Sequence, residues 1–181
     1  MNEIILVKMG ELTLKGGNRK GFEQILRRNL ITMLRARSSG SRTESRSGRI
    51  YIHCVSAEAA DLAEEALSCL MGIAGWARAQ KTEKTLDKIL TACVKEGKKL
   101  FESGARSFKI ESRRTDKSFS LNSYDICCAA GDAVLQEAPG LRVDVKHPDA
   151  TISVEIREKA YVYGSEKKGR QIGRASCRER V

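Results

Sequence analysis

The sequence predicts an α/β (α+β) fold built as two successive domains. Segments whose apolar residues recur with helical period alternate with short apolar or alternating runs that are typical of strands. A polar stretch from Gln80 to Lys84 separates two such sets. The chain has 181 residues, of which 41% are apolar but only 5% aromatic, so aliphatic side chains must fill most of both cores.

The first domain, residues 1–79, is expected to run strand–helix–strand–strand–helix–strand, the order of a ferredoxin-like domain. Its expected elements are a buried strand at Ile4–Val7, a helix at about Asn18–Arg37, a loop or exposed strand at 38–47, a half-buried strand at Arg49–Cys54, a helix at Glu58–Leu70 and a strand at Ile73–Ala79. The predicted buried residues of the two helices are Phe22, Leu26, Leu30 and Met33, then Leu62, Ala66, Leu67 and Leu70. In the strand before the second helix, Ile50, Ile52 and Cys54 should point inward and Arg49, Tyr51 and His53 outward.

The second domain, residues 80–165, is also expected to contain both helices and strands. Its expected elements are a helix at Leu86–Phe101, a strand at Ser107–Arg113, a helix from Asn122 or Ser123 to Glu137, a strand at Ile152–Ile156 and a strand at Lys159–Tyr163. Asn122 or Ser123 can cap the second helix, and Pro139-Gly140 ends it. Alternation predicts that Ser153, Glu155 and Arg157 point outward.

No constellation typical of catalysis or of metal binding is present in the sequence. The six cysteines (Cys54, Cys69, Cys93, Cys127, Cys128 and Cys177) form no Cys-x-x-Cys pair, and there are two histidines. We therefore expect no zinc site, and small buried cysteines in a reducing compartment. His147 before Pro148 is typical of a turn, and Gly16-Gly17 of either a tight turn or a phosphate contact. No apolar run approaches the roughly 20 residues that span a bilayer, so we expect a cytoplasmic protein without membrane contact.

The charge of the chain predicts a polyanionic partner. The net charge is +10, and the segment 170–181 holds four arginines and one glutamate, so the remainder still carries +7. One cluster comprises Lys15, Arg19, Lys20, Arg27, Arg28 and Arg35. The other comprises Lys109, Arg113, Arg114 and Lys117. Aromatic residues do not interleave with these clusters, which favours recognition of RNA shape and phosphates over base stacking.

Three segments resemble the tRNA 4-thiouridine synthetases, also called tRNA sulfurtransferases. They are Met9-Gly10-Glu11-Leu12-Thr13-Leu14-Lys15-Gly16-Gly17-Asn18-Arg19, then Phe108–Phe119, and Val143–Asp149 followed by Val154–Arg157 and Ala160–Val162. In that family the first position of the first motif is usually tyrosine, where this chain has Met9. The third motif adds Lys146 to the candidate RNA-binding residues.

The resemblance implies a ferredoxin-like domain, then a THUMP RNA-binding domain, then a PP-loop ATP-pyrophosphatase domain. The first two would bind the acceptor region of tRNA. The third would use ATP and Mg²⁺ to make 4-thiouridine, in a family also linked to thiamine sulfur transfer. Its Ser-Gly-Gly-x-Asp-Ser loop is absent from the 181 residues, so we expect no catalysis and no bound cofactor in this chain alone. A cysteine desulfurase as sulfur donor and a homodimer of the full-length enzyme are implied in the same way.

The likeness to the family ends near Gly164, and residues 166–181 are expected to be a non-native or out-of-frame tail outside the fold. Two alternatives stay open. One is the RNA-binding front end of another THUMP-containing tRNA-modifying enzyme. The other, of a different class, is a small-molecule-sensing regulatory module of ferredoxin-like fold.

Overall fold

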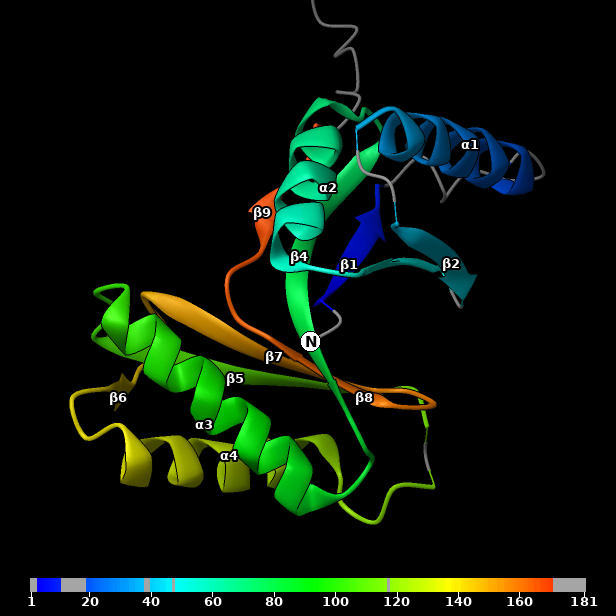
Figure 1. Cartoon of the computed structure of the whole chain (residues 1–181). Coiled ribbons are helices and arrows are strands. Elements are labelled where there is room, and N and C mark those ends of the chain that lie inside the picture. The colour runs from blue at the N-terminus through cyan, green and yellow to red at the C-terminus, as the bar shows by residue number, and fades with distance from the viewer. Residues whose placement is uncertain (1–2, 11–18, 38–39, 47, 117, 171–181) are drawn as a thin grey trace, which may run out of the picture. The chain divides into compact units, whose positions relative to one another are not determined.

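The computed structural model describes residues 3–10, 19–37, 40–46, 48–116 and 118–170 (Figure 1). The chain forms two compact units. The first runs to Trp76 and takes in the chain again from Lys167, and the second is Ala77–Glu166. Within the described residues, no helix is long and apolar enough to cross a membrane.

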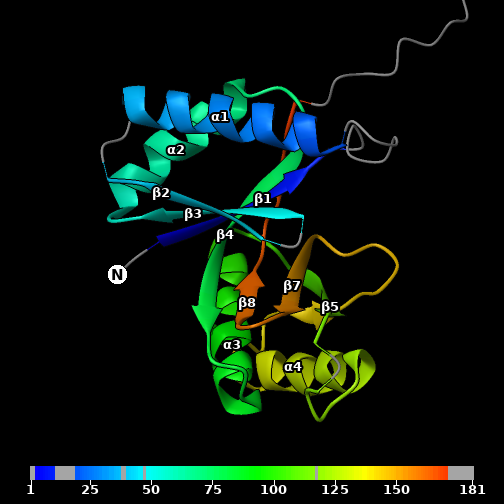
Figure 2. The same ribbon diagram turned by 90° about the vertical axis from the view of Figure 1, so that its right-hand side faces the viewer.

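The first unit has the predicted ferredoxin-like succession. It contains β1 (Glu3–Met9), α1 (Arg19–Arg37), β2 (Arg42–Arg46), β3 (Arg49–Cys54), α2 (Ala57–Cys69), the first half of β4 (Ile73–Thr82) and β9 (Lys167–Lys168). The strands lie in the order β2-β3-β1-β4, and β9 pairs with β4. Both helices lie over the same face of β1, β2 and β3 (Figure 2), which makes this unit a two-layer structure.

The core of the first unit is aliphatic, as the composition predicts. In the antiparallel pair β1–β3, Ile5 lies opposite Ile52 and Val7 opposite Ile50. Leu30 of α1 packs onto these strands from the helical layer. Ser56 caps α2 through its hydroxyl, which accepts a hydrogen bond from the Ala59 amide.

Three burial predictions for the first unit are wrong. Phe22 is 47% exposed and Leu62 is 38% exposed, whereas Leu34, which was not among the predicted residues, is buried. The buried side of α2 is formed by the alanines 59, 60, 63 and 66 with Leu67, because small side chains let the helix approach the sheet closely. Tyr51, expected to point to solvent, is only 3% exposed.

The start of the expected tail belongs to the fold. Lys167 and Lys168 pair antiparallel with Trp76 and Gly75 of β4. The Gly169 amide then donates to the Ala74 carbonyl at 2.9 Å. The expectation that 166–181 lies outside the fold is therefore wrong for its first residues, since backbone hydrogen bonds to a sheet edge require no apolar pattern. Residues 171–181 lie outside the described part of the chain.

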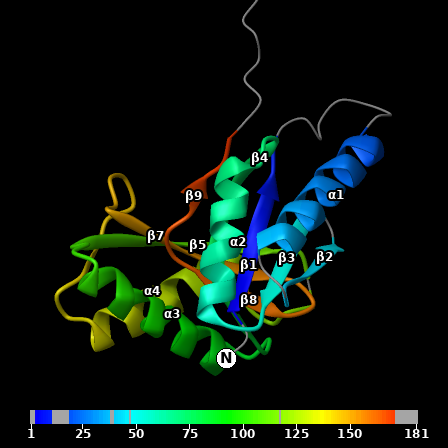
Figure 3. The same cartoon turned by 45° about the horizontal axis from the view of Figure 1, so that its top comes forward.

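The second unit places two helices on one face of a mixed sheet. It contains the second half of β4, α3 (Leu86–Glu102), β5 (Ser107–Arg114), α4 (Ser123–Glu137), β6 (Arg142–Val143), β7 (Ala150–Ile156) and β8 (Ala160–Tyr163). The strand order is β4-β8-β7-β5-β6. Strand β5 runs parallel to β6 and β7, and β8 runs antiparallel to β7 and β4. Helices α3 and α4 lie side by side (Figure 3).

The helices of the second unit begin where the sequence predicts and pack closely. Asn122 caps α4, accepting a hydrogen bond from the Asp125 amide at 3.0 Å. A Cβ added at Gly97 of α3 would lie 2.6 Å from Cγ1 of Val134 on α4, so only glycine fits this contact. Glu155, predicted to point outward to solvent, is 3% exposed and accepts hydrogen bonds from Tyr163 and Arg157.

Candidate nucleic-acid interface

The outer face of β5 carries two members of the second predicted basic cluster, Lys109 and Arg113. Lys109, Glu111 and Arg113 alternate with the core residues of this strand. Lys109 Nζ lies 2.6 Å from Glu111 Oε1, so a neighbouring carboxylate offsets much of its charge. Arg113 is exposed near the end of the strand. It is therefore the member of this cluster placed best for a phosphate contact.

Arg114 has a structural role that the sequence did not predict. Its Nη1 donates to the carbonyl oxygens of Phe119 at 2.8 Å and of Leu121 at 2.7 Å. The guanidinium thereby holds the loop that connects β5 to α4. Because backbone carbonyls occupy Nη1, Arg114 is a weaker candidate for a phosphate contact than Arg113. The side chain of Lys117, which belonged to the same cluster, lies outside the described residues.

A second set of bonds fixes the same loop from the other side. Lys84, just before α3, places Nζ 2.5 Å from Asp116 Oδ2. The other oxygen of this carboxylate accepts hydrogen bonds from the Ser118 amide at 2.9 Å and from the Ser118 hydroxyl at 2.6 Å. The hydrogen bond from Lys84 and then those from Ser118 hold the pKa of Asp116 well below its ordinary value. The carboxylate is therefore charged at neutral pH.

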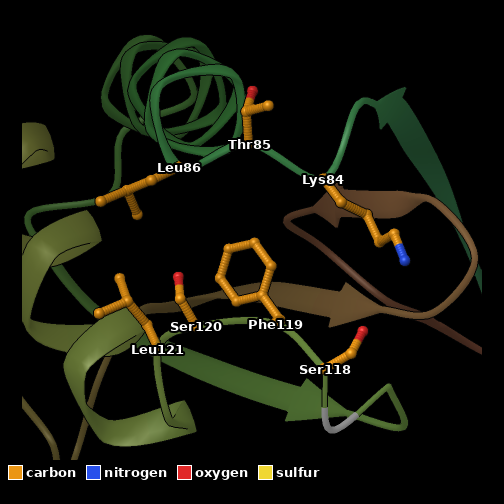
Figure 4. Close-up of a pocket in the computed structure, with 7 residues that line it drawn as sticks. All are labelled: Lys84, Thr85, Leu86, Ser118, Phe119, Ser120 and Leu121. Atoms are coloured by element: carbon orange, nitrogen blue, oxygen red, sulfur yellow. The ribbon is translucent and has the colours of Figure 1, made fainter.

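An open pocket of about 520 Å³ lies between this loop and the start of α3. Its lining residues are Lys84, Thr85, Leu86, Ser118, Phe119, Ser120 and Leu121. Figure 4 shows the Phe119 ring among these side chains, with Leu86 and Leu121 on one side and Lys84 on the other. The lining combines an aromatic ring, a cation and three hydroxyl groups. That combination suits a ligand that has both a flat ring and hydrogen-bonding groups.

The position of Phe119 corrects the interpretation of the aromatic residues. In the sequence the aromatic residues do not interleave with the basic clusters, which argues against stacking on a base. In the structure Phe119 shares a pocket with Lys84, a cation 35 positions earlier in the sequence. Sequence spacing does not reveal this juxtaposition, because the loop folds back onto the segment before α3.

Lys146 lies in a tight turn between β6 and β7. The Asp144 carboxylate accepts hydrogen bonds from the amides of Lys146 at 3.0 Å and His147 at 2.9 Å. Chiefly through the His147 amide, these bonds lower the pKa of Asp144. His147 thus lies in a turn, as predicted, and the side chain of Lys146 is exposed.

The first predicted cluster lies in the other unit, on α1. Arg27, Arg28 and Arg35 are exposed on that helix. Arg19 and Lys20 belong to its first turn, but their side chains are not among those described, and Lys15 lies outside the described residues. The described members of the two predicted clusters therefore lie on two separate units.

Sequence reasoning assigned no role to Lys84, Thr85, Ser118, Phe119 or Ser120. A signal for part of this set was present, since Ser118-Phe119-Ser120 follows the basic run directly and combines hydroxyls with an aromatic ring. Nothing in the spacing connected the set to Lys84. The ion pair with Asp116 joins the two segments, which together line the pocket.

The prediction that the cysteines are buried holds for two of the five that are described, and Cys127 is half-buried. Cys54 and Cys93 are buried, and Cys69 and Cys128 are exposed. Burial raises the pKa of Cys93 to about 12, while hydrogen bonds with Ser68 and then Arg37 lower the pKa of Cys69. In the described part of the chain, no three His, Cys, Asp or Glu side chains are grouped as metal ligands.

Two domain families match the chain in succession. The ThiI ferredoxin-like domain matches residues 4–77, and the THUMP domain matches residues 83–164. Among curated proteins, a "Probable tRNA sulfurtransferase" of Treponema pallidum subsp. pallidum is 43% identical over 166 residues. That match covers 91% of this chain and 41% of the relative, so the chain spans about two fifths of the relative's length.

Solved structures share the fold over nearly the whole chain. A 4-thiouridine synthetase, solved in complex with RNA and with bound ATP, superposes with a TM-score of 0.80 at 24% identity, over 94% of this chain and 43% of that protein. At this identity the likeness establishes the fold. PH1313 from Pyrococcus horikoshii Ot3 superposes with a TM-score of 0.80 at 28% identity, over 94% of this chain and 56% of that one.

Proposed function

Because the chain belongs to the family that joins a ThiI ferredoxin-like domain to a THUMP domain, we propose that it is the tRNA-binding portion of a tRNA sulfurtransferase. Its partner in this proposal is the acceptor region of tRNA. The reaction served would be the synthesis of 4-thiouridine. The other THUMP-containing tRNA-modifying enzymes are the alternative within the same class.

The pocket beside Phe119 carries the proposal. A volume of about 520 Å³ suits one unpaired nucleotide and is too small for a duplex. Stacking on Phe119 would hold the base, and the hydroxyls of Thr85, Ser118 and Ser120 would bind polar groups of the nucleotide. The acceptor region of tRNA ends in unpaired nucleotides, so it offers such a ligand next to a duplex.

The exposed cations supply the part of the affinity that does not depend on sequence. In this proposal Arg113 and Lys146 in the second unit, and Arg27, Arg28 and Arg35 in the first, contact phosphates. Phosphate contacts orient a protein on RNA without reading bases. The pocket would therefore select an unpaired end, while the cations would bind phosphates of the RNA.

In this proposal the chemistry of the full-length relatives takes place in other parts of those proteins. ATP, Mg²⁺ and sulfur delivery from a cysteine desulfurase would act in a PP-loop domain, whose Ser-Gly-Gly-x-Asp-Ser loop the 181 residues lack. In this proposal the chain by itself binds tRNA without catalysis. A cytoplasmic location, a homodimer of the full-length enzyme and the link to thiamine sulfur transfer belong to the same proposal.

Binding of tRNA at several salt concentrations tests the proposal. If about six phosphates are contacted, the logarithm of the association constant should fall against the logarithm of salt with a slope of roughly −4 to −5. Salt-independent binding, or none below the high micromolar range, would contradict it. A thermal-shift screen distinguishes tRNA binding from the alternative that the chain is a small-molecule sensor. Stabilisation by amino acids or free nucleotides, but not by tRNA, would indicate such a sensor.

A further inference from the structure

The three hydroxyl groups that line the pocket beside Phe119 differ in how their protons are used. The Ser118 hydroxyl donates to Asp116 Oδ1 at 2.6 Å, and the Ser118 amide donates to the same oxygen at 2.9 Å. In the part of the chain that the structure describes, the hydroxyls of Thr85 and Ser120 have no hydrogen-bond partner. Each of these two can therefore rotate to donate or to accept, whereas the single proton of Ser118 is already in use.

The carboxylate charge holds the Ser118 proton in place. Asp116 is ionised at neutral pH, because hydrogen bonds from Lys84 and then from Ser118 lower its pKa. A separation of 2.6 Å is typical of a hydroxyl bound to a carboxylate, a bond stronger than one between neutral groups. Turning the proton toward a ligand would break this bond. The Ser118 oxygen therefore presents lone pairs, and no proton, to the pocket.

The Ser118 oxygen lies beside the place that a stacked base would take. Ser118 and Ser120 precede and follow Phe119, and Figure 4 shows them on opposite sides of its side chain. A base that stacks on the Phe119 ring would direct its polar edges toward these two serines. Ser120 can match either a donor or an acceptor on such an edge. Ser118 can match only a donor.

We propose that Ser118 selects an unpaired nucleotide whose base carries an exocyclic amino group. Cytosine and adenine have this group where uracil and hypoxanthine have a carbonyl oxygen. This inference rests on the proposed function, because that function supplies the unpaired nucleotide. An amino group projects from the base and can donate directly to the Ser118 lone pairs. The ring N–H of uracil lies between two carbonyl oxygens, which repel an oxygen that brings no proton.

Asp116 is a positioning residue in this proposal, since it acts by holding the Ser118 proton. The Lys84 ammonium lies at Oδ2 of the carboxylate, and the two Ser118 donors lie at Oδ1. The carboxylate is thus fixed through both of its oxygens. The selection of a base would therefore depend on the Asp116–Ser118 pair, rather than on the Ser118 hydroxyl alone.

The test uses labelled RNA hairpins that differ only in one unpaired 3′-terminal base. In fluorescence anisotropy, the full chain should bind the hairpin ending in cytidine about 2- to 12-fold more tightly than the one ending in uridine, the range of one hydrogen bond. A pair ending in adenosine and inosine should differ in the same direction. Ser118→Ala should bring both members of each pair to equal affinity, mainly by weakening the amino-bearing one. Equal affinities for the parent chain would overturn the inference.

Ser120→Ala is the matched control, because it removes the hydroxyl on the other side of Phe119. It should keep the cytidine-to-uridine ratio of the parent chain, even if it weakens the binding of both hairpins. Ser118→Thr keeps a hydroxyl at position 118 and should keep the ratio as well. Loss of the ratio in both alanine variants would overturn the assignment to Ser118.

Asp116→Ala tests whether the held proton causes the preference. This variant releases the Ser118 proton, so it should bind both hairpins with nearly equal affinity although the hydroxyl is still present. Weaker binding of both hairpins at the parent ratio would overturn the inference. A preference that follows the 2′-hydroxyl of the terminal nucleotide, and not its base, would overturn it too. A parent chain that binds neither hairpin instead overturns the proposed function.

Discussion

Lys84 Nζ lies 2.5 Å from Asp116 Oδ2, so a cation just before α3 holds the loop that follows β5. On the other side of this loop, Arg114 donates to the carbonyl oxygens of Phe119 and Leu121. The loop that lines the candidate pocket is thus fixed by charged side chains at both ends. Fixing a binding loop in advance reduces the entropy that a ligand must lose.

The Lys84–Asp116 pair predicts how the loop responds to acid. Because the pKa of Asp116 is lowered in the folded chain, its stabilising contribution is present above the ordinary aspartate value of about 3.9 and is lost as pH falls through the lowered folded value. The chemical shift of the Ser118 amide should therefore stay constant from neutral pH to about pH 4 and change only in stronger acid. Asp116→Asn should remove this transition. A change between pH 7 and pH 5 that persists in the variant would contradict the assignment.

Arg113 and Arg114 are adjacent but should respond differently to substitution. Arg113→Ala should leave thermal stability unchanged and make the salt slope of tRNA binding less steep by about 0.7 to 0.9, because one phosphate contact is lost. Arg114→Ala should lower the free energy of unfolding by about 1–3 kcal/mol, because two carbonyl groups lose a charged donor. Calorimetry and anisotropy on both variants check this. The same effect in both variants would show that the two arginines have one role.

Phe119 should matter only for RNA with an unpaired end. Phe119→Ala should weaken binding of such an RNA by about 5- to 150-fold, which corresponds to the 1–3 kcal/mol of one stacked base. Phe119→Tyr, which keeps the ring, should bind nearly as the parent does. A blunt duplex of the same sequence should bind the parent and Phe119→Ala equally. Unchanged affinity of Phe119→Ala for the RNA with an unpaired end would rule out the stacking role.

Substitutions of two glycines in the helices of the second unit should have opposite effects on the free energy of unfolding. Gly97→Ala should lower the free energy of unfolding by about 1–3 kcal/mol, because the new Cβ would lie 2.6 Å from Val134 Cγ1. A Cβ at Gly131 of α4 meets no atom within 4 Å, so Gly131→Ala should be neutral or stabilise by about 0.5–1 kcal/mol. Urea denaturation measures both variants. A stable Gly97→Ala variant would show that the helices can move apart at no cost.

The cysteines should react in an order set by their surroundings. The thiolate is the reactive form, so Cys69, exposed and with its pKa lowered by hydrogen bonds with Ser68 and Arg37, should be alkylated well before Cys93. Burial raises the pKa of Cys93 to about 12, so that thiol stays protonated in the folded chain. Mass spectrometry after a short exposure to iodoacetamide at about pH 8 measures both sites. Unfolding the chain should abolish the difference between them.

The helices and strands and their order could be predicted from local patterns in the sequence. The α1, β3, α2 and α4 segments lie within one or two residues of their predicted bounds, because helical period, strand alternation and caps are local properties of the chain. The domain families were evident from motifs such as Phe108–Phe119, since these are read directly from the residues. The burial of individual side chains was predicted less well. The helical period of apolar residues marks the apolar face of a helix, but it does not show which residues of a wide face contact the sheet.

Which charged residues lie next to one another could not be predicted, because it depends on contacts between distant segments. Lys84 meets Asp116 across 32 positions, and Lys8 lies opposite Arg49 across 41, because the fold of a loop and the register of a sheet set these pairs. Arg113 and Arg114 are alike in sequence, yet strand alternation directs one to solvent and the other to backbone carbonyls. Composition reports how much charge a chain carries. Register and packing decide where that charge lies, because they depend on contacts between distant segments.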